Sequence, residues 1–227
     1  MTQTTAQAIP DNQPARAALS PKAQNIFSSL WATVFYSGKM SGKAVMVCSA
    51  IRQEGASTTA CALALAGSMP SGAERVALVD FNLRTPQVHR IFRLKPTPGV
   101  SEIITESHDP ASVAQKVSSG LDVYVAGEGS GRSLNVLKNP NASEFFKMLA
   151  DGYDYVVVDA AAVNHYPDAQ ILTATVPDVV LVSRSEKTPR EAIAQAKKRL
   201  EAAGGTIAGL VMNLRTYPIP RFLYKRV

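Results

Sequence analysis

The sequence predicts a doubly wound α/β domain, in which helices cover both faces of a mostly parallel sheet. Apolar strands alternate with helices along the chain, and strands buried on both faces have this near-continuous Val/Ile/Leu composition. Polar residues follow several of these strands, where ligands of such sheets bind. A length of 227 residues, 46% of them hydrophobic, provides for one sizeable core.

The expected elements alternate without an internal repeat. Strands are predicted where apolar residues run without interruption, at 44–50, 75–81, 121–127, 153–160, 178–185 and 206–213. Helices are predicted where the apolar spacing is helical or the residues are small, at 21–36, 57–69, 99–106, 109–118, 141–152 and 188–205. The helix at 141–152 is expected to begin with an Asn or Ser cap and to close with a glycine.

The two ends of the chain differ from its body. Residues 1–19 are polar and rich in Pro and Ala, without the apolar core of a signal peptide, and we expect a disordered arm there. Residues 214–227 form a basic aromatic tail. The net charge of +6 arises toward the two ends, +2 within residues 1–41 and +4 within residues 213–227, so no basic stripe crosses the body and nucleic-acid binding is disfavoured. Basic ends suit an anionic membrane surface or an acidic partner, and they also suit plain solvation.

Other features narrow the class of protein. No run of about 18 apolar residues occurs, so no membrane-spanning helix is expected. Cys48 and Cys61 fall in a predicted strand and a predicted helix, which indicates reduced core thiols in a cytosolic protein. His89, His108 and His165 lack the spacing of metal ligands.

The segment from Ala50 to Ser57 has the spacing of a phosphate-binding loop. Such a loop needs a glycine-tolerant turn, free N–H groups at a helix N-terminus, a lysine for the phosphates and a Ser or Thr for the metal. Ala50, Gly55 and Ser57 keep this frame, but Ala56 stands at the position of the lysine. The spacing alone would also fit any strand-loop-helix unit that contains one glycine.

Two aspartates strengthen the prediction of a nucleotide site. Asp80 ends the strand in "RVALVD" and Asp159 ends the strand in "YVVVD". A carboxylate at the end of a buried strand is costly unless it holds a metal, a water or a partner. Each alone could cap a helix, but beside the loop they match the magnesium-holding arrangement of nucleotide hydrolases and kinases. Asp80 and Asp159 are thus candidate vestigial catalytic residues and, with Ser57, candidate magnesium ligands.

Residues 20–213 resemble the catalytic domain of bacterial tyrosine kinases (BY-kinases), which belong to the deviant-Walker P-loop ATPases. "CSAIRQEGASTTACALALA" is similar to the Walker A segment of that family, "RVALVDFNLRTPQVHRIF" to its second Walker motif, and "YDYVVVDAAAV" to Walker B. "SPKAQNIFSSLWATVFYS" resembles the opening helix, "PGVSEII" and "VYVAGEGSGRSLNVL" resemble two further segments, and "AGLVMN" resembles the closing strand.

The resemblance implies a P-loop fold and a site for ATP or ADP with Mg²⁺. The residues that match nucleotide-binding positions of the family are Arg52, Gly55, Ala56, Ser57, Thr58, Asn82, Arg84 and Asn213. The side chain of Asn213 would face the base. Because the lysine is missing, binding of nucleotide and Mg²⁺ is expected to be weak or absent.

The departures from the family pattern affect residues that take part in nucleotide binding and phosphoryl transfer in the family. Ala56 replaces the lysine, Asn82 replaces the second acidic residue of the second Walker motif, and Arg52-Gln53 replaces the usual Pro-Gly. The polar-Pro-Pro that usually follows the Walker B aspartate is three alanines, 160–162. Asn82 therefore removes an acceptor that could take a proton from an attacking hydroxyl.

Two further departures concern the surface. Asn25, Ser28 and Trp31 stand where the family carries charges on an oligomerising helix, and Trp31 is expected to be a packing anchor. That helix could face a partner chain or fold onto its own domain. The tyrosine-rich tail of the family is reduced to Tyr217 and Tyr224, the candidate phospho-acceptors.

These losses favour a pseudokinase over an enzyme. The resemblance implies a role in exopolysaccharide biosynthesis and export, of the capsule or adhesin type. The chain would act from the cytoplasm, at the periphery of the inner membrane, by binding a membrane co-polymerase of the chain-length determinant type. Self-association is a further option. Two alternatives stay open: an active tyrosine kinase or ATPase that uses a substitute cation such as Arg52, and a deviant-Walker positioning or scaffold protein.

Overall fold

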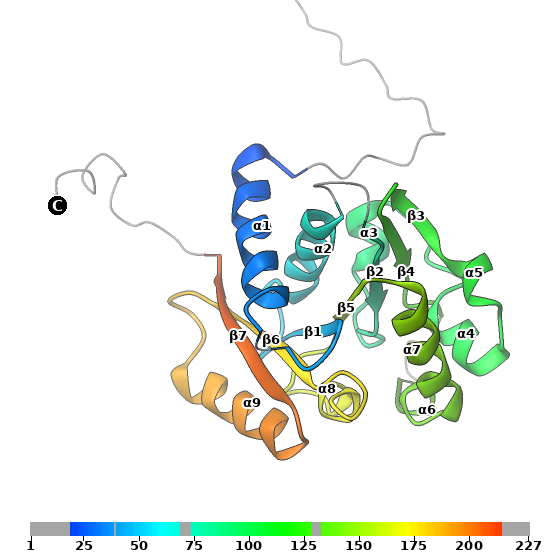
Figure 1. Ribbon diagram of the computed structural model, residues 1–227. Coiled ribbons are helices and arrows are strands. Elements are labelled where there is room, and N and C mark those ends of the chain that lie inside the picture. The colour runs from blue at the N-terminus through cyan, green and yellow to red at the C-terminus, as the bar shows by residue number, and fades with distance from the viewer. Residues whose placement is uncertain (1–18, 39, 69–73, 129–132, 215–227) are drawn as a thin grey trace, which may run out of the picture.

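The computed structural model of the chain describes residues 19–38, 40–68, 74–128 and 133–214. Within these ranges seven strands form one sheet in the order β3-β4-β2-β5-β1-β6-β7 (Figure 1). All neighbouring pairs are parallel except β3 and β4. The strands are β1 (Ala44–Ser49), β2 (Val76–Asp80), β3 (Gln115–Ser118), β4 (Leu121–Tyr124), β5 (Tyr155–Asp159), β6 (Asp178–Arg184) and β7 (Thr206–Asn213). The predicted mostly parallel α/β fold is confirmed.

Helices cover both faces of the sheet (Figure 1). One face carries α1 (Pro21–Phe35), α2 (Ala56–Gly67) and α3 (Val88–Phe92). The other face carries α4 (Val100–Glu106), α5 (Pro110–Val113), α6 (Ser133–Leu137), α7 (Pro140–Gly152), α8 (Asp168–Leu172) and α9 (Arg190–Ala202). Alternate strand residues supply the two cores, as Val45 and Val47 pack toward α2 while Met46 and Cys48 pack on the opposite face. The sheet is thus apolar on both sides.

The opening helix α1 folds onto its own domain. Trp31 is 4% exposed, and its ring lies 4.2 Å from that of Phe35 and 5.1 Å from that of Tyr155, centroid to centroid. A Cβ added at Gly67 of α2 would overlap the ring of Trp31, so the glycine permits the close approach of the two helices. The expected packing role of Trp31 is confirmed. Cys48 and Cys61 are free and buried, as expected.

The predicted helix at 109–118 is wrong in its second half. Asp109 caps α5 and Pro110 occupies its first turn, but the helix ends at Val113. Gln115–Ser118 then forms β3, which pairs antiparallel with β4 at the edge of the sheet. In so short a segment the hydrogen bonds to the neighbouring strand β4 determine the structure, because the helical propensity of a few residues is too weak to compete with them.

Short helices and caps account for the other differences. The five-residue helices α3, α6 and α8 were not expected, because five residues barely exceed one helical turn and show no period. Helix α7 begins earlier than predicted, with Asn139 as N-cap and Pro140 in its first turn. Gly152 lies inside its last turn rather than closing it. Asn139 caps this helix because its side chain accepts the N–H of Asn141.

The arm at 1–19 and the tail at 214–227 lie outside the described residues, apart from Leu19 and Leu214. The candidate phospho-acceptors Tyr217 and Tyr224 fall in that tail. In the part of the chain that is described, no helix combines the length and the apolar character needed to cross a membrane.

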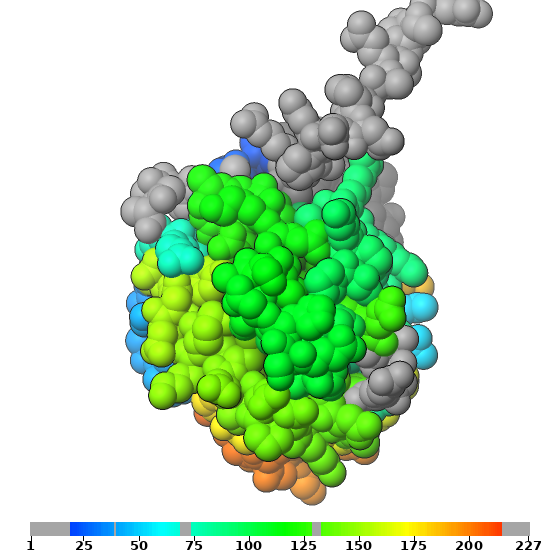
Figure 2. Space-filling view, turned by 90° about the vertical axis from the view of Figure 1, so that its right-hand side faces the viewer, coloured from blue at the N-terminus to red at the C-terminus, as the bar shows by residue number. Residues whose placement is uncertain are grey.

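The two edges of the sheet differ in how they are covered. Figure 2 looks onto the side of the molecule near β3, where α4, α5 and α7 pack closely. The opposite edge is β7, which adjoins α9 (Figure 1).

The strand order also places the functional crevice. Strand β1 lies between β5 and β6. After β1 the chain continues to β2, β3 and β4 on the β5 side of β1, and after β5 it crosses to β6 and β7 on the other side. The direction of strand order therefore reverses at β1. Ligands of such sheets bind outside the carboxyl ends of the strands at this reversal. The loop after β1 occupies that point.

Candidate functional site

The loop between β1 and α2 turns through two residues of positive φ. Gln53 has φ 65° and Gly55 has φ 88°. Gln53 stands where the family pattern has glycine, so a side chain occupies a left-handed position that glycine adopts more easily. At Gly55 an added Cβ would overlap the side-chain amide of Asn213, so both the conformation and the space require glycine.

A buried carboxylate fixes the shape of this loop. Glu54 is 1% exposed, and its side chain accepts the N–H of Ile51 at 2.9 Å, the N–H of Arg184 at 3.3 Å and the hydroxyl of Thr188. From β7, the Nδ2 of Asn213 donates to the carbonyl oxygen of Glu54 at 3.0 Å. The loop is therefore tied to β6, to the turn before α9 and to β7. The sequence reasoning missed Glu54, although an acidic residue just before the glycine of the loop was the available signal.

The N-terminus of α2 offers unpaired backbone donors. Gly55 is the N-cap and supplies no side-chain hydrogen bond, and the N–H of Thr59 donates to its carbonyl oxygen at 2.9 Å. The N–H groups of Ala56, Ser57 and Thr58 precede that first bond and have no acceptor within the helix. Such groups, with the helix dipole behind them, bind anions.

These donors face a cavity of about 410 Å³. Its lining comes from the loop, from the segment after β2 and from the segment after β5: Ser49, Arg52, Gln53, Glu54, Gly55, Ala56, Ser57, Thr58, Asn82, Thr85, Gln87, Ile91, Ala160, Ala162 and Tyr166. Among these described residues Arg52 carries the one positive charge, and its side chain is on an exposed residue of the loop. The methyl group of Ala56, 8% exposed, stands at the lysine position.

The two predicted aspartates lie side by side below the loop. Asp80 of β2 and Asp159 of β5 are register partners in adjacent parallel strands, and both are fully buried. Asp80 accepts the N–H of Asn82 at 3.1 Å and that of Val88 at 3.2 Å. Neither carboxyl oxygen of Asp159 has a hydrogen-bond partner among the described residues. Buried polar atoms without a partner are rare, and at this position they indicate a site for an ion or water.

Burial has the largest influence on the pKa values of Asp80 and Asp159. It raises the pKa of Asp80 to about 7, although the backbone N–H groups of Val88, Asn82 and Gln87 act in the opposite direction. Burial, and then the charge of Asp80, raises the pKa of Asp159 well above its usual range. The Ser57 hydroxyl partly offsets that shift through a contact that falls short of a well-formed hydrogen bond. Two adjacent carboxyl groups without a nearby cation resist ionising together.

The donor set fits Mg²⁺ only with help from a ligand or water. The unpartnered oxygens of Asp159 and the hydroxyl of Ser57 are the hard oxygen donors that Mg²⁺ prefers. In the described ranges no three His, Cys, Asp or Glu side chains cluster as a metal site. Mg²⁺ usually keeps waters and substrate phosphates in its coordination sphere, so this composition suits an ion that arrives with a nucleotide.

Arg84 and Asn82 are engaged elsewhere. The guanidinium of Arg84 donates twice to the fully buried carboxylate of Asp168, at 3.0 and 3.2 Å, and lies 4.9 Å over the ring of Tyr166. Arg84 therefore holds α8 and is not among the residues that line the cavity. Asn82 lines the cavity while its Oδ1 accepts the N–H and the hydroxyl of Thr85, each at 3.2 Å.

Asn213 likewise stands outside the lining of the cavity. Its amide nitrogen contacts the loop itself, at the carbonyl of Glu54. The structure thus brings Arg52, Gly55, Ala56, Ser57, Thr58 and Asn82 around one cavity with Asp80 and Asp159 beneath it. Arg84 and Asn213 lie outside the cavity lining, where Arg84 binds Asp168 and Asn213 binds the carbonyl of Glu54.

Comparison with curated proteins identifies tyrosine kinases. No protein-family model matches the chain. The chain is 32% identical to the tyrosine-protein kinase YwqD of Bacillus subtilis over 172 residues, which are 75% of this chain and 72% of that protein. It is 29% identical to the putative tyrosine-protein kinase CapB of Staphylococcus aureus, over 61% of each. With the putative tyrosine-protein kinase EpsB of Ralstonia solanacearum it shares 29% identity over 66% of this chain but only 20% of that longer protein.

Solved structures agree on the fold. The chimerical protein CapA2B2 superposes with a TM-score of 0.80 at 23% identity, covering 91% of this chain and 88% of that one. The kinase domain of the Escherichia coli tyrosine kinase ETK gives 0.75 at 22% identity, over 87% of this chain and 78% of that domain. A ParA family ATPase from Chlorobium tepidum gives 0.61 at 17% identity, over 76% and 74%. With the sequence relationship to YwqD, these likenesses show that the chain belongs to the bacterial tyrosine-protein kinase family.

Proposed function

We propose that this chain is a pseudokinase of exopolysaccharide biosynthesis and export, which acts by binding a membrane co-polymerase of the chain-length determinant type. The observation that carries the proposal is the start of α2, where Ala56 replaces the lysine above two buried carboxyl groups. The polysaccharide pathway and the partner rest on the resemblance to BY-kinases set out above.

The positive charge that a lysine would supply matters because the reaction of the family is phosphoryl transfer. Phosphoryl transfer is catalysed mainly by positioning and by stabilising the charge of the transferred group. Removal of one preorganised contact to that charge typically raises the barrier by about 3 kcal/mol or more. At Ala56 a methyl group faces the cavity where a cation would be needed. Asn82 weakens the site further, since its side-chain oxygen accepts hydrogen bonds from Thr85 and an amide is a poor proton acceptor.

The available substitutes for the lysine are limited. Arg84 is held by Asp168 in a bidentate ion pair, and its release would leave a fully buried carboxylate without its partner. Arg52 lines the cavity from an exposed position on the loop, so an active kinase or ATPase that uses Arg52 is the second candidate function. An exposed, long side chain is poorly preorganised, which favours the pseudokinase.

The enzymatic half of the proposal is tested by single-turnover incubation of the full chain with ATP and Mg²⁺. We expect neither phosphotyrosine nor release of ADP above that of an Asp159→Asn control. Autophosphorylation that persists in the purified chain would overturn the pseudokinase. Loss of that activity in Arg52→Ala would then identify Arg52 as the substitute cation.

The partner half is tested by capture from membranes. The tagged chain is expected to retain a chain-length determinant co-polymerase from detergent-solubilised membranes of the source organism. The same amount should be retained with and without ATP, because a pseudokinase would bind through its persistent shape. A co-polymerase that fails to bind in either condition would contradict the proposed partner, and the third reading, a positioning or scaffold protein, would then gain support.

A further inference from the structure

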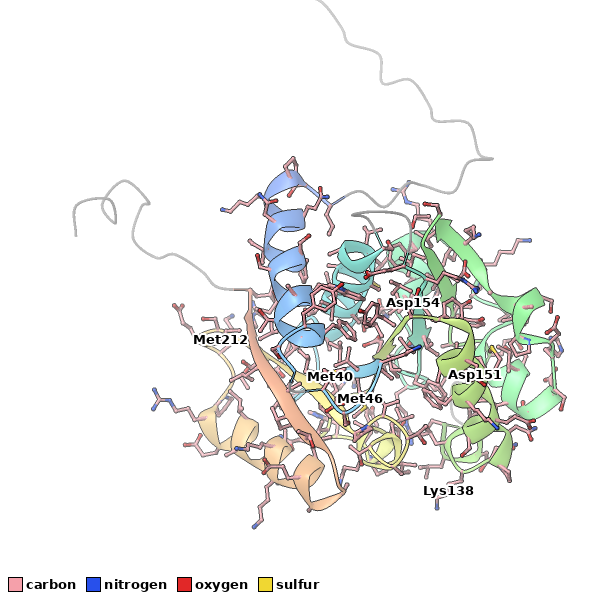
Figure 3. The ribbon with its side chains drawn as sticks, viewed as in Figure 1. Met40, Met46, Lys138, Asp151, Asp154 and Met212 are labelled. Atoms are coloured by element: carbon pink, nitrogen blue, oxygen red, sulfur yellow. The ribbon has the colours of Figure 1, made fainter. Side chains whose placement is uncertain are left out.

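The edge of the sheet at β7 carries exposed apolar side chains. Within the described residues β7 pairs only with β6, so its other edge is open. Leu210 and Met212 of β7 are 49% and 72% exposed, and Figure 3 shows Met212 at the flank of the sheet. Both line a groove of about 540 Å³ together with Arg190 and Ile193 of α9. The edge strand and the adjoining helix thus form one surface.

The backbone of β7 directs hydrogen-bonding groups to this surface. The carbonyl of Asn213 accepts the N–H of Ser185, so the backbone groups of Asn213 point toward β6. This direction alternates along a strand, so Val211 also faces β6, whereas the N–H and carbonyl groups of Leu210 and Met212 point outward. Outward groups of this kind are a template for a strand of another chain.

The other edge of the sheet is protected in ways that β7 is not. Strand β3 has four residues, carries Lys116 and has a register shift between Lys116 and Ser118. Short length, a charged residue and an irregular register are the features that keep edge strands from pairing with other chains. Strand β7 has eight residues, and its exposed side chains at Leu210 and Met212 are apolar. It therefore lacks these protections.

The contacts of α9 show which of its sides lies beyond β7. Arg199 donates to the carbonyl oxygens of Val163 and Asn164, in the segment after β5. The side chain of Asn164 in turn donates to the carbonyl oxygen of Ala192. These contacts hold one flank of α9 toward the centre of the sheet. The opposite flank faces past the edge strand, in agreement with the place of Arg190 in the groove.

The outer flank of α9 is complementary to itself. Exposed residues three or four positions apart share this flank: Arg190, Ala194, Lys197 and Glu201. Two copies of the helix placed antiparallel would set Arg190 of each against Glu201 of the other, and the long Lys197 against the small Ala194. Glu201 lies 3.6 Å from Lys197 of its own helix, and its exposed carboxylate can accept a second cation. Such self-complementarity suits a two-fold axis.

We propose that two copies of this chain associate through this surface, with β7 pairing antiparallel to the β7 of the second copy across a two-fold axis perpendicular to the sheet. The sheet then continues from one protomer into the other, and the two α9 helices lie antiparallel on the same face. Leu210, near the middle of β7, comes close to the axis, and the side chains of Leu210 and Met212 are covered. The association requires neither a nucleotide nor a co-polymerase.

Light scattering of the full chain tests the association. From about 1 to 300 μM we expect a monomer–dimer equilibrium with a micromolar Kd, as suits an interface of one strand edge and one helix. Leu210→Lys places a charge at the middle of the edge and should weaken the dimer at least about tenfold. Gln195→Lys adds the same charge on the exposed side of α9 that points away from the sheet, and should leave the Kd unchanged. A chain that stays monomeric over this range would overturn the proposal.

A charge-reversal pair tests the antiparallel placement of α9. Arg190→Glu alone sets an acidic group against Glu201 of the second copy, and Glu201→Arg alone sets a basic group against Arg190. Each should weaken the dimer about tenfold, because like charges then meet at both ends of the interface. The double variant exchanges the two charges and should recover most of the affinity. A double variant weaker than either single variant would contradict the assigned arrangement.

Hydrogen exchange identifies what covers the edge. The amides of Leu210 and Met212 should exchange at least about fivefold more slowly at the highest protein concentration than at the lowest. The amide of Val211 faces β6, so its exchange is the internal control and should not change. Protection of Leu210 and Met212 in the monomer would assign the edge to a segment of the same chain and overturn the dimer. Protection that appears only with a membrane co-polymerase present would assign it to that partner and also overturn it.

Discussion

Two fully buried aspartates at the same end of the sheet have opposite surroundings. Asp168 of α8 accepts two hydrogen bonds from Arg84, one from Nε and one from Nη2. Asp159 of β5 has no hydrogen-bond partner on either oxygen among the described residues. A buried carboxylate is tolerated when it is paired and is costly when it is not. The first aspartate therefore belongs to the scaffold, whereas the second keeps both oxygens open for a ligand of the candidate site.

The phosphate loop shows the same contrast between contacts made inside the protein and groups left open for a ligand. The shape rests on contacts inside the protein, which Glu54 and Asn213 supply. The proposed loss of phosphoryl transfer rests on position 56, where the chain has alanine in place of the lysine that the resemblance implies. Alanine at position 56 is therefore compatible with the shape of the loop, because the contacts that hold this shape come from Glu54 and Asn213.

The largest effect on stability is expected at the paired aspartate. Arg84→Ala leaves the carboxylate of Asp168 buried and unpaired, which should lower the free energy of unfolding by about 3 kcal/mol. Urea denaturation measures this loss, and Arg52→Ala is the control, expected within about 0.5 kcal/mol of the parent chain. The double change Arg84→Met with Asp168→Asn should recover most of the stability. Equal effects of the two single arginine changes would erase the contrast between scaffold and site.

Restoring the cation is the next largest change. Ala56→Lys should tighten binding of ATP with Mg²⁺ by about tenfold to a hundredfold, since a charge-assisted hydrogen bond contributes about 1.5–3 kcal/mol. Titration calorimetry provides the affinity. Ala56→Met has a similar length without the charge and should bind no better than the parent chain. A lysine variant that stays as weak as the methionine variant would mean that the loop has lost its shape as well.

The pH dependence of stability follows from the raised pKa values. The folded chain keeps protons on the Asp80 and Asp159 pair that the unfolded chain releases above a pH of about 4. Because the folded state binds more protons over this range, the stability contribution is full below about pH 4 and falls as pH rises through 7. The midpoint of urea denaturation measured from pH 5 to 8 should decline.

Replacing the buried carboxyl group of Asp159 by an amide should stabilise the protein at high pH, because the folded chain then no longer has to keep a proton there. Asp159→Asn is expected to raise the free energy of unfolding at pH 8 by about 2 kcal/mol and to flatten its pH dependence, as sites for ligands often sacrifice stability. Asp151→Asn, at an exposed position of α7 (Figure 3), is the control and should change it by less than about 0.5 kcal/mol. A destabilised Asp159→Asn variant would show that the carboxylate has an internal partner after all.

The smallest effect is expected at Glu54. Glu54→Gln replaces one accepting oxygen by a donor, so the N–H of Ile51 and the hydroxyl of Thr188 compete for the remaining acceptor, whereas the N–H of Arg184 also donates to Thr188. The cost should be about 1 kcal/mol of unfolding free energy. Denaturation of Glu144→Gln, at an exposed position of α7, provides the matched control. If Glu54→Gln were as neutral as that control, the loop would be held by other contacts.

Much of the site could be predicted because its signals are local. The glycine and Ser57 of the loop and the two aspartates at strand ends stand in short segments, and parallel strands bring their carboxyl ends to one edge. The pattern of apolar runs likewise predicted the strands other than β3. Gln115–Ser118 escaped prediction because a four-residue edge strand is stabilised by its neighbour β4 rather than by its own pattern.

The sequence by itself determined the fold class, the loop, the missing lysine and the two strand-end aspartates, since each is written in one contiguous segment. Only the tertiary structure decided that Arg84 pairs with Asp168, that Glu54 holds the loop and that Asp159 finds no hydrogen-bond partner in the described part of the chain. These contacts join residues distant in the chain, such as Glu54 and Arg184 or Arg84 and Asp168. Which buried charge is compensated depends on what the fold places within hydrogen-bonding distance, and no local pattern records that.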